Sequence, residues 1–471
     1  MPLTWVVYFC ETKHDMAQLP YQSLNPATEV LVAEFPYAED AEVDQALLTA
    51  DRAFDGWRSM DIEMRAQAFE RLAERLKARK SELAGLITTE MGKPQAQAEA
   101  EIDKCHWLIE FYAGSAPAFL MDEHPQIGED KQATVSYESL GIVLGVMPWN
   151  FPFWQVMRYA VPALLAGNVS ILKHAENVPQ CASAIASLFE EAEFPTGTFQ
   201  NLFATHEQIA RLLDDMRVQG LTVTGSDKAG SHLASLAGKA IKKSVLELGG
   251  SDPFIVFADS DLRAAVGAGI MARYQNSGQS CIAGKRFLVE QSIYSQFMGM
   301  YSDAVKRLTI GDPSEGHYIG PMARADLRDQ LAGQIAESER GGAVYDELVA
   351  APEGPGFYHG AGMLTEVRPG VPAYEDEMFG PVATLMPFNR AEEAIKLAND
   401  SRYGLGAAVW TADSDRAQYM ARALQCGFVA VNSMVKSDPR LPFGGVKQSG
   451  YGRELGMQGI REFTNIKTIL Q

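Results

Sequence analysis

The stretch Gly141-Ile-Val-Leu-Gly-Val-Met147, followed by Pro148-Trp-Asn-Phe-Pro152, decides the fold. Its short, continuous apolar run is typical of a strand buried on both faces, and the two prolines predict a rigid turn after it. A helix to Leu165 and a second strand at 170–173 follow. Strands that alternate with helices form right-handed βαβ units, so the pattern predicts a parallel sheet.

The alternation continues on both sides of residue 250. Further strands are expected at 198–203, 220–224 and 244–248, separated by helices. A second alternation begins at 254–257 and runs to about residue 431. Because 471 residues exceed what one core serves, the sequence predicts two α/β lobes. Ligands of such folds bind beyond the carboxyl ends of the strands.

Composition excludes several classes of partner and site. The formal net charge of -19 argues against nucleic acid and anionic membranes. The five cysteines are far apart, as in a reducing cytosol, and the histidines lack metal-ligand spacing, so no bound metal is expected. No apolar run could span a bilayer, which predicts a cytoplasmic protein. Residues 1–16 are expected to be an extension, with Met16 as an alternative start.

Cys281 is the candidate nucleophile. A helix is expected to end near Tyr274, and Asn276, Ser277 and Gly278 are turn residues before the thiol. A strand follows at 286–289. A thiol on a small-residue loop between helix and strand is well placed to attack an electrophile. Considered alone, however, a free cysteine is more often a small buried hydrophobic residue.

Other polar residues occupy strand ends, where packing does not require them. Asn150 lies in the proline-bracketed turn, either to point an amide at a substrate oxygen or as a simple turn residue. Lys173 and Glu176 form either a ribose-binding pair or a surface ion pair. Glu247, between two leucines and before two glycines, is either a buried paired acid or a base with a raised pKa.

These segments, in this order, resemble the aldehyde dehydrogenase superfamily from about residue 25 onward. The resemblance is carried by Pro148-Trp-Asn-Phe-Pro152, Leu172-Lys173, Thr224-Gly-Ser226, Glu247-Leu-Gly-Gly250, Gly278-Gln-Ser-Cys281, Glu377-Met-Phe-Gly-Pro381 and Pro442-Phe-Gly-Gly445. Within the superfamily, the sequences of these motifs are most similar to those of the bacterial succinate-semialdehyde dehydrogenases.

The resemblance implies NAD(P)-dependent oxidation of an aldehyde, with succinate semialdehyde giving succinate. Cys281 would attack as thiolate and form a thiohemiacetal and then a thioester, Asn150 would stabilise the oxyanion, and Glu247 would activate the hydrolytic water. Glu454 matches a position linked to proton relay or to bracing of the site. NAD is favoured over NADP because the Glu176 carboxylate would repel the 2′-phosphate of NADP. NADP remains possible, since Lys173 alone could hold that phosphate.

The resemblance also assigns binding residues. Those expected to hold the cofactor are Trp149, Lys173, Glu176, Gly225, Ser226, Gly230, Leu248, Glu377 and Phe379. Arg158 would bind the substrate carboxylate, unless it only caps a helix surface. Gln275 stands where some of these enzymes carry a second arginine, and Ser437 is a neutral candidate ligand.

Domain organisation follows from the same resemblance. The expected division is an extension (1–16), a cofactor-binding domain (17–121 and 140–248), a catalytic domain (249–445) and an oligomerisation segment (122–139 and 446–471). The family's strands that pair across subunits correspond to 134–138 and 464–470, which implies a homodimer or homotetramer. Two alternatives remain open: a broad-specificity aldehyde dehydrogenase, and a non-redox thiol hydrolase or acyltransferase. The hydrolase is disfavoured because no histidine flanks the thiol.

Overall fold

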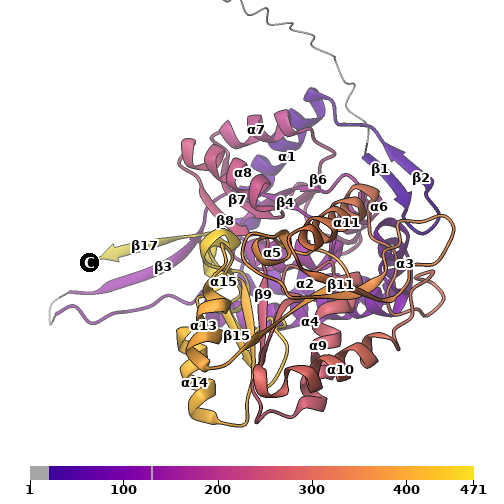
Figure 1. Ribbon diagram of the computed structural model, residues 1–471. Helices are drawn as coiled ribbons and strands as arrows, with labels where there is room; N and C mark the ends of the chain where they lie inside the picture. Colours follow the sequence, from indigo (N-terminus) through magenta and orange to yellow (C-terminus); the bar gives the residue numbers. More distant parts are fainter. Residues whose placement is uncertain (1–20, 129–130) are drawn as a thin grey trace, which may run out of the picture.

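The computed structural model of the protein describes residues 21–128 and 131–471 (Figure 1). The expected extension, residues 1–16, lies outside the described residues. The described chain contains two large, mostly parallel β-sheets with helices packed on them, and two antiparallel strand pairs. The expectation of an α/β fold with two parallel-sheet lobes is confirmed. Among these residues, no helix has both the length and the apolar composition of a membrane span.

The first sheet has six strands in the order β16-β8-β7-β4-β5-β6. They are β4 (Ile142–Met147), β5 (Val169–His174), β6 (Phe199–Asn201), β7 (Val218–Thr224), β8 (Lys243–Glu247) and β16 (Gly450–Tyr451). Central β4 pairs in parallel with β5 and β7, whereas the edge strand β16 is antiparallel to β8. Ile142, Val143 and Leu144 are buried, because helices cover both faces of a parallel sheet.

Helices from three parts of the chain pack around this sheet. They are α1 (Asp40–Arg58), α2 (Ile62–Ala78), α3 (Lys80–Met91), α4 (Gln95–Phe119), α5 (Pro152–Leu165), α6 (Pro179–Glu191), α7 (His206–Asp214), α8 (Asp227–Lys239) and α15 (Gly456–Glu462). The long α4 packs against α2, α3 and α5. A hairpin of β1 (Tyr21–Asn25) and β2 (Val30–Phe35), which the sequence did not predict, precedes these helices.

The second sheet has seven strands in the order β11-β12-β13-β10-β9-β14-β15. They are β9 (Asp252–Val256), β10 (Gly284–Glu290), β11 (Val344–Val349), β12 (Ala361–Thr365), β13 (Val382–Phe388), β14 (Gly406–Trp410) and β15 (Phe428–Val431). Only the edge strand β11 is antiparallel. The helical segments are α9 (Leu262–Tyr274), η1 (Gln275–Gly278), η2 (Gln291–Ile293), α10 (Tyr294–Val305), α11 (Ala325–Arg340), α12 (Pro372–Glu375), α13 (Ala391–Asn399), α14 (Ser414–Ala423) and η3 (Lys447–Ser449).

A two-stranded ribbon projects from the body of the molecule (Figure 1). It consists of β3 (Ala133–Ser139) and β17 (Thr464–Leu470), which pair antiparallel over their full length. The two segments expected to be strands there are therefore strands, and within one chain they pair with each other. Ile466 and Leu470 on the ribbon are 61% and 60% exposed.

The polar strand ends meet where the two sheets approach each other. Asn150 follows β4, Glu247 ends β8, and Cys281 lies in the loop between α9 and β10. Gly250, just beyond β8, lies against this loop: a Cβ there would be 2.6 Å from the carbonyl oxygen of Cys281. The fold thus brings together three residues of which the outer two, Asn150 and Cys281, are more than a hundred positions apart in the sequence.

Candidate active site

The loop that carries Cys281 has a restricted backbone path. Asn276, Ser277 and Gly278 have φ angles of 55°, 54° and 73°, in the left-handed region that most side chains avoid. A Cβ on Gly278 would also lie 2.2 Å from the carbonyl oxygen of Gly380. Glycine is therefore required at 278, and the close approach to Gly380 fixes the loop against the second sheet.

Hydrogen bonds attach this loop to the end of β4. The Asn276 Nδ2 donates to the backbone oxygen of Asn150 at 2.8 Å, and the Asn150 Nδ2 donates to the backbone oxygen of Gln279 at 3.0 Å. Lys285 donates from Nζ to the backbone oxygen of Cys281 at 2.7 Å. One of the two Asn150 Nδ2 hydrogens is used in this way, which leaves the other for a substrate oxygen.

Cys281 is half-buried and borders two cavities at once. The larger cavity has a volume of about 580 Å³, and the smaller cavity about 370 Å³. The larger cavity is lined by residues that include Gln97, Lys104, Trp107, Phe151, Trp154, Arg158, Gln275, Ser437 and Phe443. The smaller cavity is lined by residues that include Trp149, Asn150, Thr224, Gly225, Ser226, Leu248, Glu377, Phe379 and Tyr403. A thiol at this boundary can contact molecules bound on either side.

Glu247 is a buried carboxyl group with an unusual proton affinity. Its side chain is 2% exposed, and neither carboxylate oxygen has a hydrogen-bond partner among the described residues. Burial raises its pKa to about 8; nearby Arg158 lowers that pKa, and Glu454 raises it further. A carboxylate with such a pKa can accept a proton near neutral pH, which is the property of a general base.

Arg158 is shared between two carboxylates. It forms an ion pair with Glu454, and its Nη2 lies 4.0 Å from the Glu247 Oε2. The guanidinium also lies 5.0 Å from the ring centre of Phe443. Arg158 also lines the larger cavity, where a substrate ligand is expected, but two buried carboxyl groups already lie against it.

The thiol itself is not ionised easily in this environment. Burial raises the pKa of Cys281 to about 12; Arg158 and Lys285 lower it, while Glu377 and Glu247 raise it further. At neutral pH the neutral thiol is therefore the main form, so attack on a carbonyl requires a group that accepts the thiol proton.

The smaller cavity brings together many of the residues predicted to bind a dinucleotide. Those that line it are Trp149, Gly225, Ser226, Leu248, Glu377 and Phe379, whereas Lys173, Glu176 and Gly230 lie outside its lining. Lys173 and Glu176 are joined at the end of β5, with 3.3 Å between Nζ and Oε1. Gly230 packs so closely that a Cβ there would be 2.3 Å from the Leu248 Cδ2.

These surroundings fit a dinucleotide. Ser226 caps α8 by accepting a hydrogen bond from the Ala229 N–H, and the positive end of the helix dipole favours an anion such as a pyrophosphate. Glu377 is fixed by an ion pair with the Lys285 Nζ at 2.8 Å and by a hydrogen bond from the Gly250 N–H at 3.2 Å. A fixed carboxylate can accept the two hydroxyls of a ribose, and the glycines admit the cofactor backbone.

The larger cavity contains all three predicted substrate residues, Arg158, Gln275 and Ser437, together with Lys104, which the sequence did not single out. Lys104 donates from Nζ to the Ser437 Oγ at 2.7 Å. The sequence carries no clear signal for this role, because Lys104 follows the charged Asp103 on a helix, where a lysine usually faces solvent.

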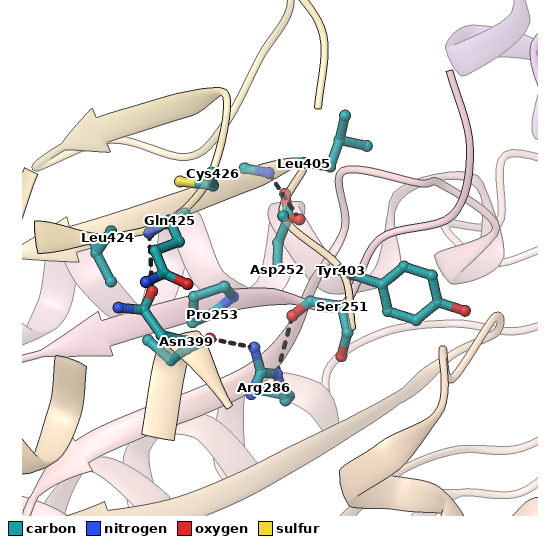
Figure 2. A pocket seen from close by; sticks show the side chains of 14 residues that line it. Ser251, Asp252, Pro253, Arg286, Asn399, Tyr403, Leu405, Leu424, Gln425 and Cys426 are labelled. Carbon is teal, nitrogen blue, oxygen red and sulfur yellow. Dashed lines mark hydrogen bonds between the residues drawn. The ribbon is translucent and has the colours of Figure 1, made fainter. Parts of the chain in front are cut away.

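A third hollow, in the second sheet, has a different character (Figure 2). Its volume of about 10 Å³ admits roughly one water molecule. Asp252 accepts a hydrogen bond there from the Gly406 N–H at 2.9 Å, and Arg286 donates to the Ser251 backbone oxygen at 2.9 Å. Cys426 borders this hollow, but the hollow is too small to hold a substrate. Within residues 21–128 and 131–471, no cluster of three His, Cys, Asp or Glu side chains could hold a metal ion.

Comparison with known proteins places these features in context. Residues 13–469 match the aldehyde dehydrogenase family. A probable succinate-semialdehyde dehydrogenase (NADP(+)) from Synechocystis sp. is 46% identical over 95% of this chain and 98% of its own length. The succinate semialdehyde dehydrogenase (NAD(P)+) Sad from Escherichia coli is 46% identical over 95% of this chain and 97% of its own.

Solved structures are similar over the same extent. The succinic semialdehyde dehydrogenase from Streptococcus pyogenes, in complex with NADP+ as the cofactor, superimposes with a TM-score of 0.93 at 34% identity. The match covers 95% of this chain and 99% of the other.

Proposed function

The chain belongs to the aldehyde dehydrogenase family, and on that premise we propose that its substrate is succinate semialdehyde, which it oxidises to succinate. The family resemblance expected from the sequence is confirmed by this membership. The protein is an NAD(P)-dependent aldehyde dehydrogenase, as are relatives that match it at 46% identity over nearly their full length. The particular aldehyde and the roles of individual residues are our proposals.

One observation supports the proposed reaction most directly: Cys281 borders both cavities. An aldehyde in the larger cavity and a nicotinamide in the smaller cavity would meet at this sulfur. When bound, the nicotinamide supplies the acceptor for the hydride that leaves the aldehyde carbon. Trp149, Glu377 and Phe379 would hold it.

In the proposed first step, the Cys281 sulfur forms a bond to the aldehyde carbon, and the carbonyl electron pair moves to oxygen. The thiol proton would pass to water in the cavity, and Arg158 and Lys285, which lower the pKa of Cys281, would favour the thiolate. The free Asn150 N–H and the Cys281 backbone N–H would stabilise the oxyanion, and a donor of this kind contributes ~3–4 kcal/mol. Oxidation of the thiohemiacetal leaves a thioester on Cys281.

In the second step, Glu247 would remove a proton from water as the water oxygen attacks the thioester carbon. The carbon–sulfur bond then breaks and the acid is released, and the sulfur takes the proton from Glu247, which restores both the thiol and the carboxylate. Gly249 and Gly250 lie two and three residues after Glu247. Because glycines restrict the backbone little, this segment can reorient the carboxylate between the two steps.

We propose NAD as the preferred cofactor, with NADP accepted. The Glu176 carboxylate can accept hydrogen bonds from a ribose diol and repels a 2′-phosphate, whereas Lys173 at 3.3 Å attracts one. The names of the relatives, which mention NADP(+) and NAD(P)+, fit a site in which these opposed charges leave both cofactors usable.

We further propose that the protein acts in the cytoplasm as a homodimer or homotetramer. The widely separated cysteines support the location. The apolar Ile466, Ile469 and Leu470 of the projecting ribbon support assembly, because such side chains are stabilised when a second chain covers them. The expected domain boundaries (17–121 with 140–248, 249–445, and 122–139 with 446–471) remain part of this proposal.

The test is steady-state NADH formation with a series of semialdehydes and with neutral aldehydes of matching length. We expect kcat/KM for succinate semialdehyde to exceed that for butanal by roughly ten-fold or more, the effect of a charge-assisted hydrogen bond. Equal values would indicate a broad-specificity dehydrogenase instead. Absence of NADH with every aldehyde would indicate the thiol hydrolase alternative.

A further inference from the structure

The substrate's carboxylate needs a cation in the larger cavity, and the expected arginine is poorly suited to supply it. Arg158 is 2% exposed, paired with Glu454 and near Glu247. The ion pair with Glu454 already compensates the charge of Arg158. A third carboxylate placed beside it would be repelled as well as attracted. Gln275 is neutral, although it stands at the position where some enzymes of this kind carry a second arginine.

We propose that Lys104 is a specificity-determining residue that binds the carboxylate end of the substrate, together with Ser437. This inference rests on the proposed function, because it concerns the carboxylate of the semialdehyde. Lys104 extends from α4 into the larger cavity, which it borders together with Cys281. A semialdehyde in that cavity can thus present its aldehyde to the thiol and its carboxylate to the lysine.

The surroundings of Lys104 leave its charge available. Its Nζ lies 4.1 Å from the ring centre of Trp154 and donates one hydrogen bond, to the Ser437 Oγ. An ammonium has three donors, so two remain for the oxygens of a carboxylate. Among the described residues no carboxylate lies within ion-pair distance of Lys104, whereas buried Lys93 on the preceding loop is paired with Glu101.

Partial burial without an ion-pair partner destabilises the charged form of Lys104. Its pKa falls to about 7, chiefly through burial and further through the nearby Arg158 and Lys436. A bound carboxylate would compensate for the lost hydration, so the site gains more from an anion than an exposed lysine would. Ser437 accepts the lysine's hydrogen bond and can still donate its own hydroxyl proton to the same carboxylate.

A structural role is the competing explanation, since a lysine stem also covers apolar surface. In that case Lys104 would only pack on Trp154. Replacement by a neutral side chain would then affect charged and uncharged substrates equally, and the two roles are separable by comparing succinate semialdehyde with butanal.

The experiment uses Lys104→Met and Lys104→Gln, with Lys104→Arg to restore the charge. We expect the neutral variants to raise KM for succinate semialdehyde by about 10- to 100-fold, the range of a hydrogen bond between charged groups, with a much smaller change in kcat. The ratio of kcat/KM for the semialdehyde to that for butanal falls by the same factor. Lys104→Arg recovers most of that ratio. Lys104→Gln keeps a polar terminus and serves if the methionine variant does not fold.

Lys436→Met is the matched control, because Lys436 borders the same cavity but is exposed at its rim. We expect its loss to be less than a third of that of Lys104→Met. A larger loss in the control than in Lys104→Met would overturn the assignment of the site to Lys104.

A second readout separates failure of this inference from failure of the proposed function. Succinate is measured as a competitive inhibitor of butanal oxidation, and its inhibition constant should rise at least ten-fold in Lys104→Met. If wild type prefers succinate semialdehyde but both succinate inhibition and KM are unchanged in the variants, the Lys104 site is wrong and the proposed function stands. If wild type prefers butanal, the proposed function is wrong, and the inhibition constants alone decide whether Lys104 binds carboxylates.

Discussion

The side-chain amide of Asn150 donates a hydrogen bond to the backbone oxygen of Gln279, 3.0 Å away. This bond joins the end of a strand in the first sheet to the loop of the second sheet that carries the thiol. The distance between the proposed oxyanion donor and Cys281 therefore depends on how the two sheets are held together, and not on either sheet alone.

Asn150→Ala tests the role of this amide. We expect kcat to fall by about 10²- to 10³-fold, as for the removal of an oxyanion donor, with a smaller change in KM. Steady-state NADH formation measures both constants. Asn201→Ala, at the end of β6 in the same sheet and outside both cavity linings, should retain the wild-type kcat. A wild-type kcat in Asn150→Ala would contradict the assignment.

Glu247→Gln separates the two steps of the reaction. The glutamine cannot remove a proton from water, so the thioester should accumulate. We therefore expect a rapid burst of NADH formation, followed by a steady-state rate of NADH formation that is lower than wild type by about 10²-fold or more. Stopped-flow absorbance resolves the two phases. Below its pKa of about 8 the glutamate is protonated and inactive as a base. The wild-type kcat should therefore rise as pH increases through this value, and the variant should lack the rise.

Glu454→Gln should shift that pH profile. Glu454 raises the pKa of Glu247 through like-charge repulsion, and it also engages the arginine that lowers this pKa. Its neutralisation should move the midpoint of the kcat profile to lower pH. Glu110→Gln, an exposed substitution on α4, serves as the charge-matched control. A midpoint that stays in place or moves upward would show that the two carboxyl groups are not coupled in this sense.

Glu176→Gln tests cofactor choice. Loss of the negative charge should raise kcat/KM for NADP relative to NAD by about five-fold, the upper range for one exposed charge. The ratio is measured at saturating aldehyde. Glu193→Gln removes an exposed charge elsewhere and should leave the ratio unchanged. A wild-type preference for NADP would already defeat the argument from Glu176.

Much of the fold could be predicted from local pattern. The strands expected at 141–147, 170–173 and 220–224 form with ends shifted by a few residues, because the buried strands of a parallel sheet have continuous apolar runs. The edges could not be predicted in this way. The two-residue strand β16 has no periodicity of its own, and it exists because residues distant in sequence lie beside β8.

The site shows the same limit. Cys281, Glu247 and Asn150 occur in motifs that the sequence presents locally. The cluster of Arg158, Glu454 and Glu247 could not be inferred as a unit, since its members come from α5, the carboxyl-terminal segment and β8. Lys104 escaped attention because a single lysine on a helix usually faces solvent, and only the packed structure shows that it borders the cavity.

The hydroxyl of Ser449 donates to the backbone oxygen of Gly249 at 2.6 Å, although the two residues are 200 positions apart in the chain. During synthesis, a ribosome must therefore translate nearly the whole message before the segment after Glu247 acquires its neighbour. The nascent chain would contain Cys281 long before it contained Ser449, whose hydrogen bond fixes the segment that follows Glu247. A chain that stalls late in translation thus contains the thiol but lacks the contact that fixes Gly249.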